Sequence, residues 1–309
     1  MGAPSSLFEV ESFLKNMFND PLILGIKNNF GRKMLASFIT HKRLEDTKKN
    51  YQAIGGKSPL LEHTANLVKT LNALDSKRLY TFAMRYTPPF AYGVLDELKS
   101  QNIESVVLFS LYPQFCTATI HSSLLDAKAA LKSLNFSPKL LKVSHYHTHP
   151  SYIACIVEKI KQALKGEDSK DFVLLLSAHS LPQSRIEQGD PYQKQCEENK
   201  AALESALQQQ GIMFKKIALS YQSKVGKMKW LEPSTKDAIT HFKNEKLIIF
   251  PLSFTLDNSE TDYELKILYA NHAQNLGIKD YRVCDCFNAD VSFANTIIEL
   301  IQGASDEKN

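Results

Sequence analysis

The feature that most constrains the fold is an uninterrupted apolar run, DFVLLLSA at residues 171–178, which ends directly at His179. A strand that is apolar on both sides has both of its faces covered, which is typical of a parallel sheet flanked by helices. Similar short β-rich runs alternate with longer helical patterns along the chain, at 78–86, 105–111, 139–145, 215–221, 246–254 and 280–286. This alternation predicts an α/β fold with parallel sheets.

The chain has 309 residues, enough for two domains, and its predicted strands fall into two sets. We place an N-terminal domain at 1–150, with three strands, and a C-terminal domain at 151–309, with four strands spaced as in βα units. An amphipathic stretch at 191–211 predicts a helix that ends at the C-cap candidate Gly211. We expect the polar tail GASDEKN to be frayed.

Composition and charge argue against several classes of protein. Hydrophobic residues make up 43% and charged residues 23%, as in soluble globular proteins. The net charge of +4 is small and no dense Lys/Arg block occurs, so a nucleic-acid partner is not expected. No apolar run approaches the roughly 18 residues of a membrane-spanning helix, and the opening MGAPSSLFEV does not resemble a signal peptide. Five cysteines form no CxxC pair, which favours free thiols and a cytoplasmic location.

Polar and aromatic side chains follow most of the predicted strands. In doubly wound sheets, ligands bind beyond the carboxyl ends of the strands. Residues 85–89 follow the first strand, and His179 follows the fourth. Residues 222–226 lead from the fifth strand toward Trp230, the only tryptophan, and residues 257–264 follow the sixth. We therefore expect an imidazole, carboxylates and aromatic rings to gather at one sheet edge.

His179 and Glu260 are the pair with the clearest chemistry. A neutral imidazole binds divalent transition metals, and a nearby carboxylate can ligate the metal or accept a proton. Glu264 lies four residues after Glu260, on the same helix face, and extends the carboxylate series. Two plainer interpretations stay open: His179 as a core histidine with backbone partners, and Asp257 with Glu260 as a capping box.

Three further patterns carry less weight. GGKS at 55–58 resembles the end of a P-loop, but position 51 is tyrosine rather than glycine and a helical pattern precedes it. Residues 145–149 contain three alternating histidines, which we interpret as a solvated loop rather than a metal-ligand set. The CDC spacing at 284–286 is too short for a zinc knuckle.

Seven segments resemble the ferrochelatase family, whose members insert ferrous iron into a porphyrin to make haem. They occur in the family's order over nearly the whole chain: MGAPSSLFEVESFL (1–14), IGGKSPL (54–60), MRYTPP (84–89), LYPQF (111–115), SAHSLP (177–182), YQSKVGKMKWLEPST (221–235) and PLSFTLDNSETDYEL (251–265). The resemblance implies two Rossmann-like domains with a porphyrin cleft between them. It also implies a lyase that inserts Fe²⁺ into protoporphyrin IX with release of two protons, the terminal step of haem biosynthesis.

The resemblance also implies residue roles. His179 and Glu260 match the family's catalytic and metal-binding pair. Four residues fall where the family lines its porphyrin pocket: Met1, Arg85, Tyr86 and Trp230. Of these, Arg85 is suited to a porphyrin propionate.

This chain departs from the family pattern at three positions. Asn258 replaces a common histidine, Leu268 replaces a polar residue or carboxylate, and Tyr221 stands where many members have tryptophan. The first two changes argue against an extended carboxylate relay but not against the His179–Glu260 pair. Glu264 and Asp257 are the candidates for a short proton or metal relay. No organic cofactor is required, because Fe²⁺ is a substrate. No iron–sulfur cluster is expected, because the cysteine-bearing C-terminal extension of some members has no counterpart here.

The resemblance leads to two further expectations. Family members usually have an apolar strand ahead of the segment that begins here at Met1, so we expect that the first domain lacks its opening strand and that the natural protein begins several residues upstream. Four apolar residues have two interpretations, packing in the core, which we favour, or a lip for peripheral contact with the inner membrane: Leu22, Ile23, Leu24 and Ile26. We expect a monomer.

Three alternative functions remain open at this stage. A non-catalytic porphyrin or haem carrier needs the pocket but not both His179 and Glu260. A chelatase acting on another tetrapyrrole or metal needs the same residues. A periplasmic binding protein has a related two-domain architecture, but the cysteine pattern and the opening sequence argue against export.

Overall fold

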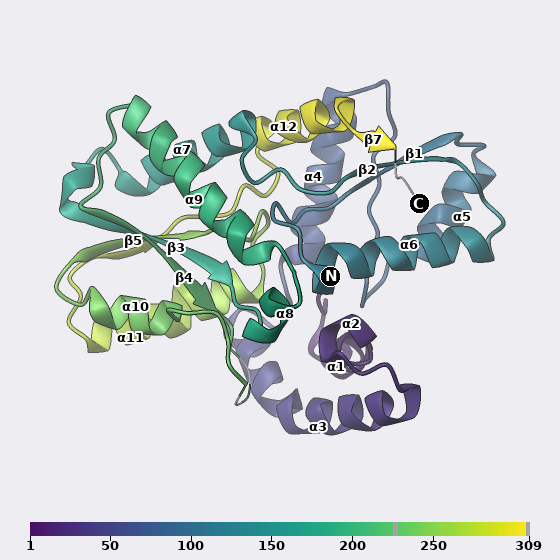
Figure 1. Ribbon diagram of the computed structural model, residues 1–309, viewed down its shortest axis with the longest axis horizontal. Helices are drawn as coiled ribbons and strands as arrows, with labels where there is room; N and C mark the ends of the chain where they lie inside the picture. Colours follow the sequence, from purple (N-terminus) through teal and green to yellow (C-terminus); the bar gives the residue numbers. More distant parts are fainter. Residues whose placement is uncertain (225, 227, 307–309) are drawn as a thin grey trace. The chain divides into compact units, whose positions relative to one another are not determined.

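The structure is a computed structural model that describes residues 1–224, 226 and 228–306 (Figure 1). It has an α/β fold with parallel strands and flanking helices, as the alternating pattern predicts. Two residues of the 221–235 segment, Val225 and Lys227, lie outside the described residues.

The chain forms two compact units, and each is made of more than one segment rather than lying wholly on one side of residue 150. Unit 1 contains residues 1–110, residues 116–144 and the described residues from 297 onward. Unit 2 contains residues 111–115 and 145–296. The chain therefore contributes the short segment 111–115 to unit 2, returns to unit 1 over residues 116–144, and then forms the rest of unit 2. Its described C-terminal residues belong to unit 1 again.

Hydrogen bonds explain both departures from a single division. Thr255 Oγ1 donates to the carbonyl oxygen of Leu111 at 2.8 Å, and Gln114 Nε2 donates to Asn199 Oδ1 at 2.8 Å, which attaches the short segment to unit 2. At the chain's end, strand β7 (Ser305–Asp306) pairs antiparallel with a strand of unit 1. The prediction of a frayed tail is therefore wrong for these two residues, because sheet pairing satisfies their backbone.

Unit 1 is built on a three-stranded sheet in the order β1-β2-β7, in which β1 (Ser105–Phe109) and β2 (Lys139–Val143) are parallel. Side chains of α5 (Ala91–Ser100) and α6 (Ser122–Ser133) form one apolar cluster with this sheet, and side chains of α1 (Val10–Phe18) and α3 (Asn29–Ala53) contribute to a second. The helices of unit 1 are η1 (Leu7–Glu9), α1 (Val10–Phe18), α2 (Pro21–Leu24), α3 (Asn29–Ala53), α4 (Leu60–Leu74), α5 (Ala91–Ser100), η2 (Thr117–His121) and α6 (Ser122–Ser133).

The prediction of a strand at residues 78–86 is wrong. This segment makes only an isolated bridge between Met84 and Phe90. Its backbone is held instead by Asn72 of α4, whose side chain bonds the N–H of Tyr80 at 3.0 Å and its carbonyl oxygen at 2.9 Å. β-Propensity reports how well side chains fit a pleated surface, and it cannot supply a neighbouring strand.

Unit 2 is built on a parallel sheet in the order β4-β3-β5-β6. Its strands are β3 (Phe172–His179), β4 (Lys216–Gln222), β5 (Lys246–Pro251) and β6 (Tyr281–Val283). Its helices are α7 (Pro150–Leu164), η3 (Ser169–Asp171), α8 (Gln183–Glu187), α9 (Tyr192–Gln209), α10 (Thr235–His241), η4 (Glu260–Tyr269) and α11 (Ala270–Asn275), and α12 (Val291–Gln302) leads from unit 2 into unit 1. The predicted helix at 191–211 is thus confirmed as α9.

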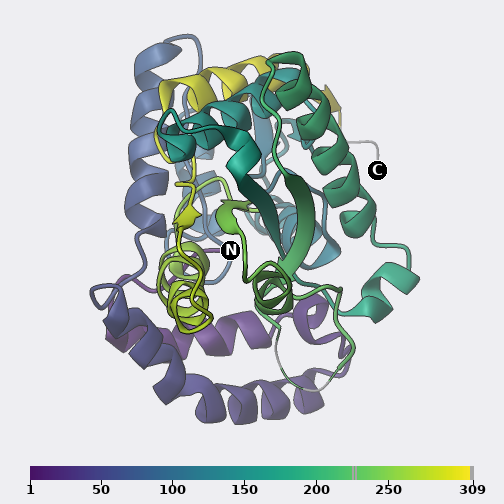
Figure 2. The same ribbon diagram turned by 90° about the vertical axis from the view of Figure 1, so that its left-hand side faces the viewer.

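Helices cover both faces of the unit 2 sheet, as the uninterrupted apolar run predicts. Helices α7 and α9 pack against each other and against β5 and β4, while α10 and α11 lie on the opposite face (Figure 2). Residues 172–178 of the central strand are at most 1% exposed. Val173 and Leu175 pack against Ile239 of α10 and Leu265 of η4. This burial makes the carboxyl end of β3 a rigid platform.

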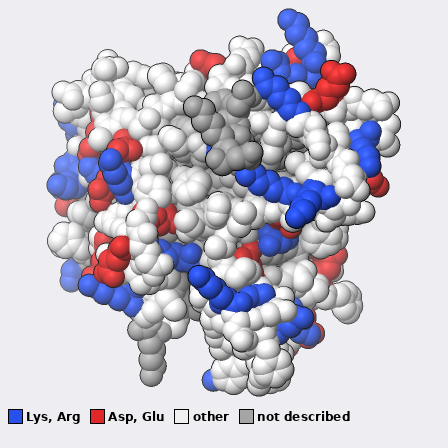
Figure 3. Space-filling model, turned by 45° about the vertical axis from the view of Figure 1, so that its right-hand side comes forward, with Lys and Arg blue, Asp and Glu red and all other residues white. Residues whose placement is uncertain are grey.

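Charged side chains of both signs are spread among uncharged ones on the face shown in Figure 3, consistent with the small net charge of +4. Among the described residues, no helix is both long and apolar enough to cross a bilayer.

Truncating Leu175, which is fully buried in the core of unit 2, should lower the free energy of unfolding. Leu175→Ala removes apolar contacts and leaves a cavity, so we expect a loss of about 2–5 kcal/mol. Urea unfolding followed by the fluorescence of Trp230 measures it. The matched control is Leu268→Ala, whose side chain is 46% exposed and should change the value by less than about 0.5 kcal/mol. Equal effects of the two changes would contradict the assignment of this core.

Candidate active site

The structure brings His179 and Glu260 together. His179 is the last residue of β3, where its backbone leaves the buried strand and its side chain is 38% exposed. Glu260 is the first residue of η4, and its side chain is 36% exposed. His179 Nδ1 lies 3.0 Å from Glu260 Oε1. The exposed imidazole and its carboxylate neighbour exclude the interpretation of His179 as a core histidine with backbone partners.

The capping box predicted for Asp257 and Glu260 is wrong by one residue. Asn258 Oδ1 accepts a hydrogen bond from the backbone N–H of Glu260 at 2.8 Å, and Thr261 Oγ1 accepts from the backbone N–H of Asn258 at 2.9 Å. These two reciprocal bonds cap the helix start. Because Asn258 and Thr261 perform this task, the Glu260 carboxylate is available to His179.

Glu260 begins a π-helix rather than an α-helix. π-Helical segments are rare and frequently occur at functional sites. Glu264 lies in the same segment, and its charge also acts on His179. One imidazole therefore lies in the field of two carboxylates.

Burial and charge act in opposite directions on His179. Burial lowers the pKa of the imidazole. The charge of Glu260, its hydrogen bond to the ring and a smaller contribution from the charge of Glu264 together outweigh burial and hold the pKa above its usual value. The 3.0 Å between Nδ1 and Glu260 Oε1 makes this contact an ion pair once the imidazole is protonated. The pair is suited to accepting a proton.

Sequence reasoning missed the residues that support this pair. The hydroxyl of Tyr192 donates to the carbonyl oxygen of His179 at 2.9 Å and pairs with Ser253 Oγ at 2.6 Å. Gln222 lies opposite His179 in the parallel register of β4 and β3. A polar residue at the end of an apolar strand was a signal for Gln222, whereas nothing in the local pattern distinguished Tyr192.

The two residues predicted as a relay have other partners. The Glu264 carboxylate accepts from Gln222, Ser223 and Tyr269. Asp257 is 4% exposed and accepts from Asn288 Nδ2 at 2.7 Å and from Lys266 Nζ at 3.5 Å.

The residues predicted to line a porphyrin pocket in unit 1 form a connected group. The carbonyl oxygen of Met1 accepts from the backbone N–H groups of Arg85 and Tyr86, at 3.1 and 2.8 Å. The Arg85 guanidinium lies 3.1 Å from Asp20 and 3.3 Å from Asp126, and 5.2 Å from the centre of the Tyr86 ring. Tyr86 is 1% exposed, and its hydroxyl donates to Asp20 at 2.9 Å. Arg85, at 26% exposure, is the accessible member of this pair.

Trp230 lies beside the segment that follows His179. It bridges Pro182 in antiparallel fashion, and the flanking Leu231 donates its N–H to Leu181 at 3.0 Å. Its side chain is half-buried.

The histidines at 145–149 are not all solvated, which corrects our interpretation. His147 is 3% exposed, and its Nε2 lies 2.9 Å from Glu198 of α9. Sequence alone did not indicate a carboxylate from so distant a segment. Among the described residues, no group of three or more His, Cys, Asp or Glu has metal-binding geometry. GGKS at 55–58 lies between α3 and α4 and follows no strand, as expected, and all five cysteines are buried thiols.

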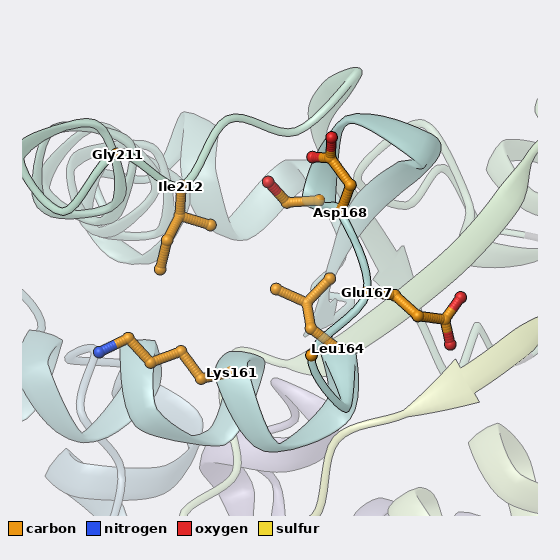
Figure 4. A pocket seen from close by; sticks show the side chains of 8 residues that line it. Lys161, Leu164, Glu167, Asp168, Gly211 and Ile212 are labelled. Carbon is orange, nitrogen blue, oxygen red and sulfur yellow. The ribbon is translucent and has the colours of Figure 1, made fainter.

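A cavity of about 340 Å³ lies far from this chemistry. It is lined by residues such as Lys161, Leu164 and Ile212, and by Asp168 and Ser169 just before β3 begins, at the end of the strand opposite His179 (Figure 4). The Glu167 carboxylate turns away from it and binds Arg282 instead. The cavity therefore plays no part in the site formed by His179 and Glu260.

The parallel sheet of unit 2 carries an imidazole beside a carboxylate at its carboxyl edge, and the α/β fold of the chain is that of the chelatase class. The fold resembles SirB from Bacillus subtilis with Fe³⁺, at a TM-score of 0.58, 10% identity, and coverage of 78% of this chain and 89% of that one. Residues 1–305 match the ferrochelatase family model. The chain is 69% identical to ferrochelatase of Helicobacter hepaticus, over 98% of this chain and 97% of that protein, and 50% identical to ferrochelatase of Wolinella succinogenes, over 97% and 95%. It belongs to the ferrochelatase family.

The charge environment of His179 predicts its titration. In Glu260→Gln the larger opposing charge is lost, so the pKa of His179 should fall below its wild-type value. A raised pKa in the wild type means that the imidazole becomes neutral only at higher pH, so its capacity to take up a proton is lost as pH falls through that pKa. A ¹⁵N-histidine NMR titration measures both proteins. An unchanged His179 pKa in the variant, with the fold intact, would contradict the assigned pairing.

Proposed function

We propose that His179 and Glu260 carry the reaction of this ferrochelatase, the insertion of Fe²⁺ into protoporphyrin IX. The observation that carries the proposal is the 3.0 Å approach of Nδ1 to Oε1 at the open end of a buried strand. The reaction removes two pyrrole protons, so it needs a proton acceptor beside the metal path. It needs no redox change and no organic cofactor, because iron is a substrate.

In this proposal His179 is the proton acceptor. The pKa of His179, which burial lowers but Glu260 raises to a net increase, makes its neutral form a stronger base than an ordinary histidine. Glu260 stabilises the imidazolium that forms, and its second oxygen can meet the incoming metal. Passage of the second proton follows release of the first to solvent, which the 38% exposure of His179 permits.

We further propose that Arg85 binds a porphyrin propionate. Its guanidinium rests on the buried Tyr86 ring and is held by Asp20 and Asp126, so it is oriented before a ligand arrives. In this proposal Tyr86 supports the Arg85 guanidinium rather than contacting the porphyrin, and the carbonyl oxygen of Met1 binds the backbone N–H groups of both residues. Trp230, half-buried beside the segment after His179, offers an aromatic surface to a flat macrocycle.

Anaerobic incubation with protoporphyrin and Fe²⁺, followed by the porphyrin's visible spectrum, tests the assignment. We expect wild-type turnover and a loss of about 100-fold or more in His179→Ala, within the range for removal of a general base. The matched control is His241→Ala, an exposed histidine on α10 of the same unit, which should retain full activity. Full activity in His179→Ala would overturn the assignment.

Contact of the monomeric protein with a membrane surface is a second proposal, and it is supported by α3 rather than by residues 22–26. Ile23 and Leu24 pack against the core of unit 1. By contrast, Phe30, Met34 and Phe38 recur every four residues along α3 and are 75%, 61% and 55% exposed. Basic side chains flank this stripe, and the Lys42 ammonium lies 4.5 Å from the Phe38 ring centre. An apolar stripe with basic neighbours suits an anionic lipid surface.

Co-sedimentation with phosphatidylglycerol vesicles tests this second proposal. Changing Phe30, Met34 and Phe38 together to serine should weaken binding by about tenfold or more, because apolar surface that enters the lipid is lost. Leu125→Ser is the control, since Leu125 is 47% exposed on α6 of the same unit. Vesicle binding that is unaffected by the triple change would rule out this surface.

A further inference from the structure

Gln222 is a buried polar residue in direct register with His179. It ends β4, its Cα pairs with that of His179, and its carbonyl oxygen accepts from the N–H of Ser180 at 2.8 Å. Its side chain is fully buried, at 0% exposure. A buried amide must find partners for its oxygen and its nitrogen within the protein.

The Gln222 side chain joins the strand that carries His179 to the helix that carries Glu260. Its Oε1 accepts from Ser177 Oγ of β3 at 2.6 Å. Its Nε2 donates to the carbonyl oxygen of Glu260 at 3.1 Å and to Glu264 Oε2 at 3.3 Å. The last two partners only accept hydrogen bonds, so the nitrogen must face η4 and the oxygen must face β3. The Gln222 amide therefore has one orientation, in which both its oxygen and its nitrogen are hydrogen-bonded.

Glu264 anchors the same arrangement. Besides Gln222, its carboxylate accepts from the Ser223 N–H at 2.9 Å, from Ser223 Oγ, and from the Tyr269 hydroxyl at 2.8 Å. A carboxylate offers about four lone-pair sites, so these four donors occupy it. Ser223 has φ of 66°, a left-handed conformation that is uncommon for residues other than glycine, and both of its bonds to Glu264 hold it there. The Glu264 carboxylate is thus held in one orientation.

We propose that Gln222 is a positioning residue that sets the separation of His179 from Glu260, and that Glu264 is its anchor rather than a relay. The proposal rests on the proposed function of the His179–Glu260 pair. Besides the contact of His179 with Glu260, the Gln222 amide connects β3 directly to the first residue of η4. When its donor is lost, the start of η4 moves relative to His179, and small displacements of reacting groups have large effects on rate.

The sharpest test is Gln222→Glu, which keeps size and keeps the acceptor for Ser177 but turns the donor into an acceptor facing Glu260 and Glu264. We expect kcat to fall and KM for Fe²⁺ to rise, each contributing to a loss of about 10–100-fold in kcat/KM, with KM for protoporphyrin unchanged. A general loss of folded protein would instead lower kcat without changing either KM. Calorimetric titration with Co²⁺ alone should show the same weakened metal binding without turnover.

The exchange variant Gln222→Glu/Glu264→Gln provides the rescue. It restores a donor opposite an acceptor between the two side chains, so we expect recovery of at least about tenfold over Gln222→Glu. Gln195→Glu is the matched control: Gln195 is a buried glutamine of α9 whose Oε1 accepts from the N–H of Phe115 at 2.6 Å, a bond that glutamate retains. Its activity should stay within about twofold of wild type.

The outcomes separate this proposal from the proposed function. Wild-type kcat and metal KM in Gln222→Glu would overturn the positioning role and leave the His179–Glu260 assignment intact. An exchange variant that recovers neither folding nor activity would also overturn it. Absence of iron insertion by the wild type would overturn the proposed function, and the Co²⁺ titrations of the single and exchange variants would still decide whether Gln222 positions the pair.

Discussion

The parallel register of β3 and β4 is the constraint on which the active site depends. It places Gln222 opposite His179, and the buried amide then holds the first residue of η4. Because β3 is covered on both faces and at most 1% exposed over residues 172–178, this register cannot slip without exposing the core. The position of one imidazole against one carboxylate is therefore set by the packing of the whole unit.

This rigidity suits the chemistry. Burial lowers the pKa of His179, and the charges of two carboxylates together with the hydrogen bond to Glu260 outweigh it. Such opposing effects stay balanced only where the groups are held still, since electrostatic interaction changes steeply over a few ångströms in a partly buried site. Unit 1 is organised differently: most residues of β1 and β2 are half-buried, and its charged cluster centres on Asp20 and Arg85.

Much of the fold was predictable, and the failures have physical causes. The predicted strands that became β1 to β6 lie beside neighbours of matching pattern, whereas the run at 78–86 has similar propensity but no strand to pair with among the described residues. The capping box was misplaced because Asp257 and Asn258 are both good cap residues, and only the geometry of η4 chooses between them. His147 appeared solvated because its partner, Glu198, comes from a helix 51 residues away in sequence.

The sequence by itself determined the α/β class, the buried strand that ends at His179, and, through the family's motifs, the pairing of His179 with Glu260. These properties depend on local periodicity or on residues that recur in order, which a single chain displays. Only the tertiary structure decided which polar groups hold that pair. The partners of Gln222 and Glu264 come from β3, β4 and η4, segments far apart in sequence, and hydrogen bonds between such segments exist only after the sheet and its helices have packed.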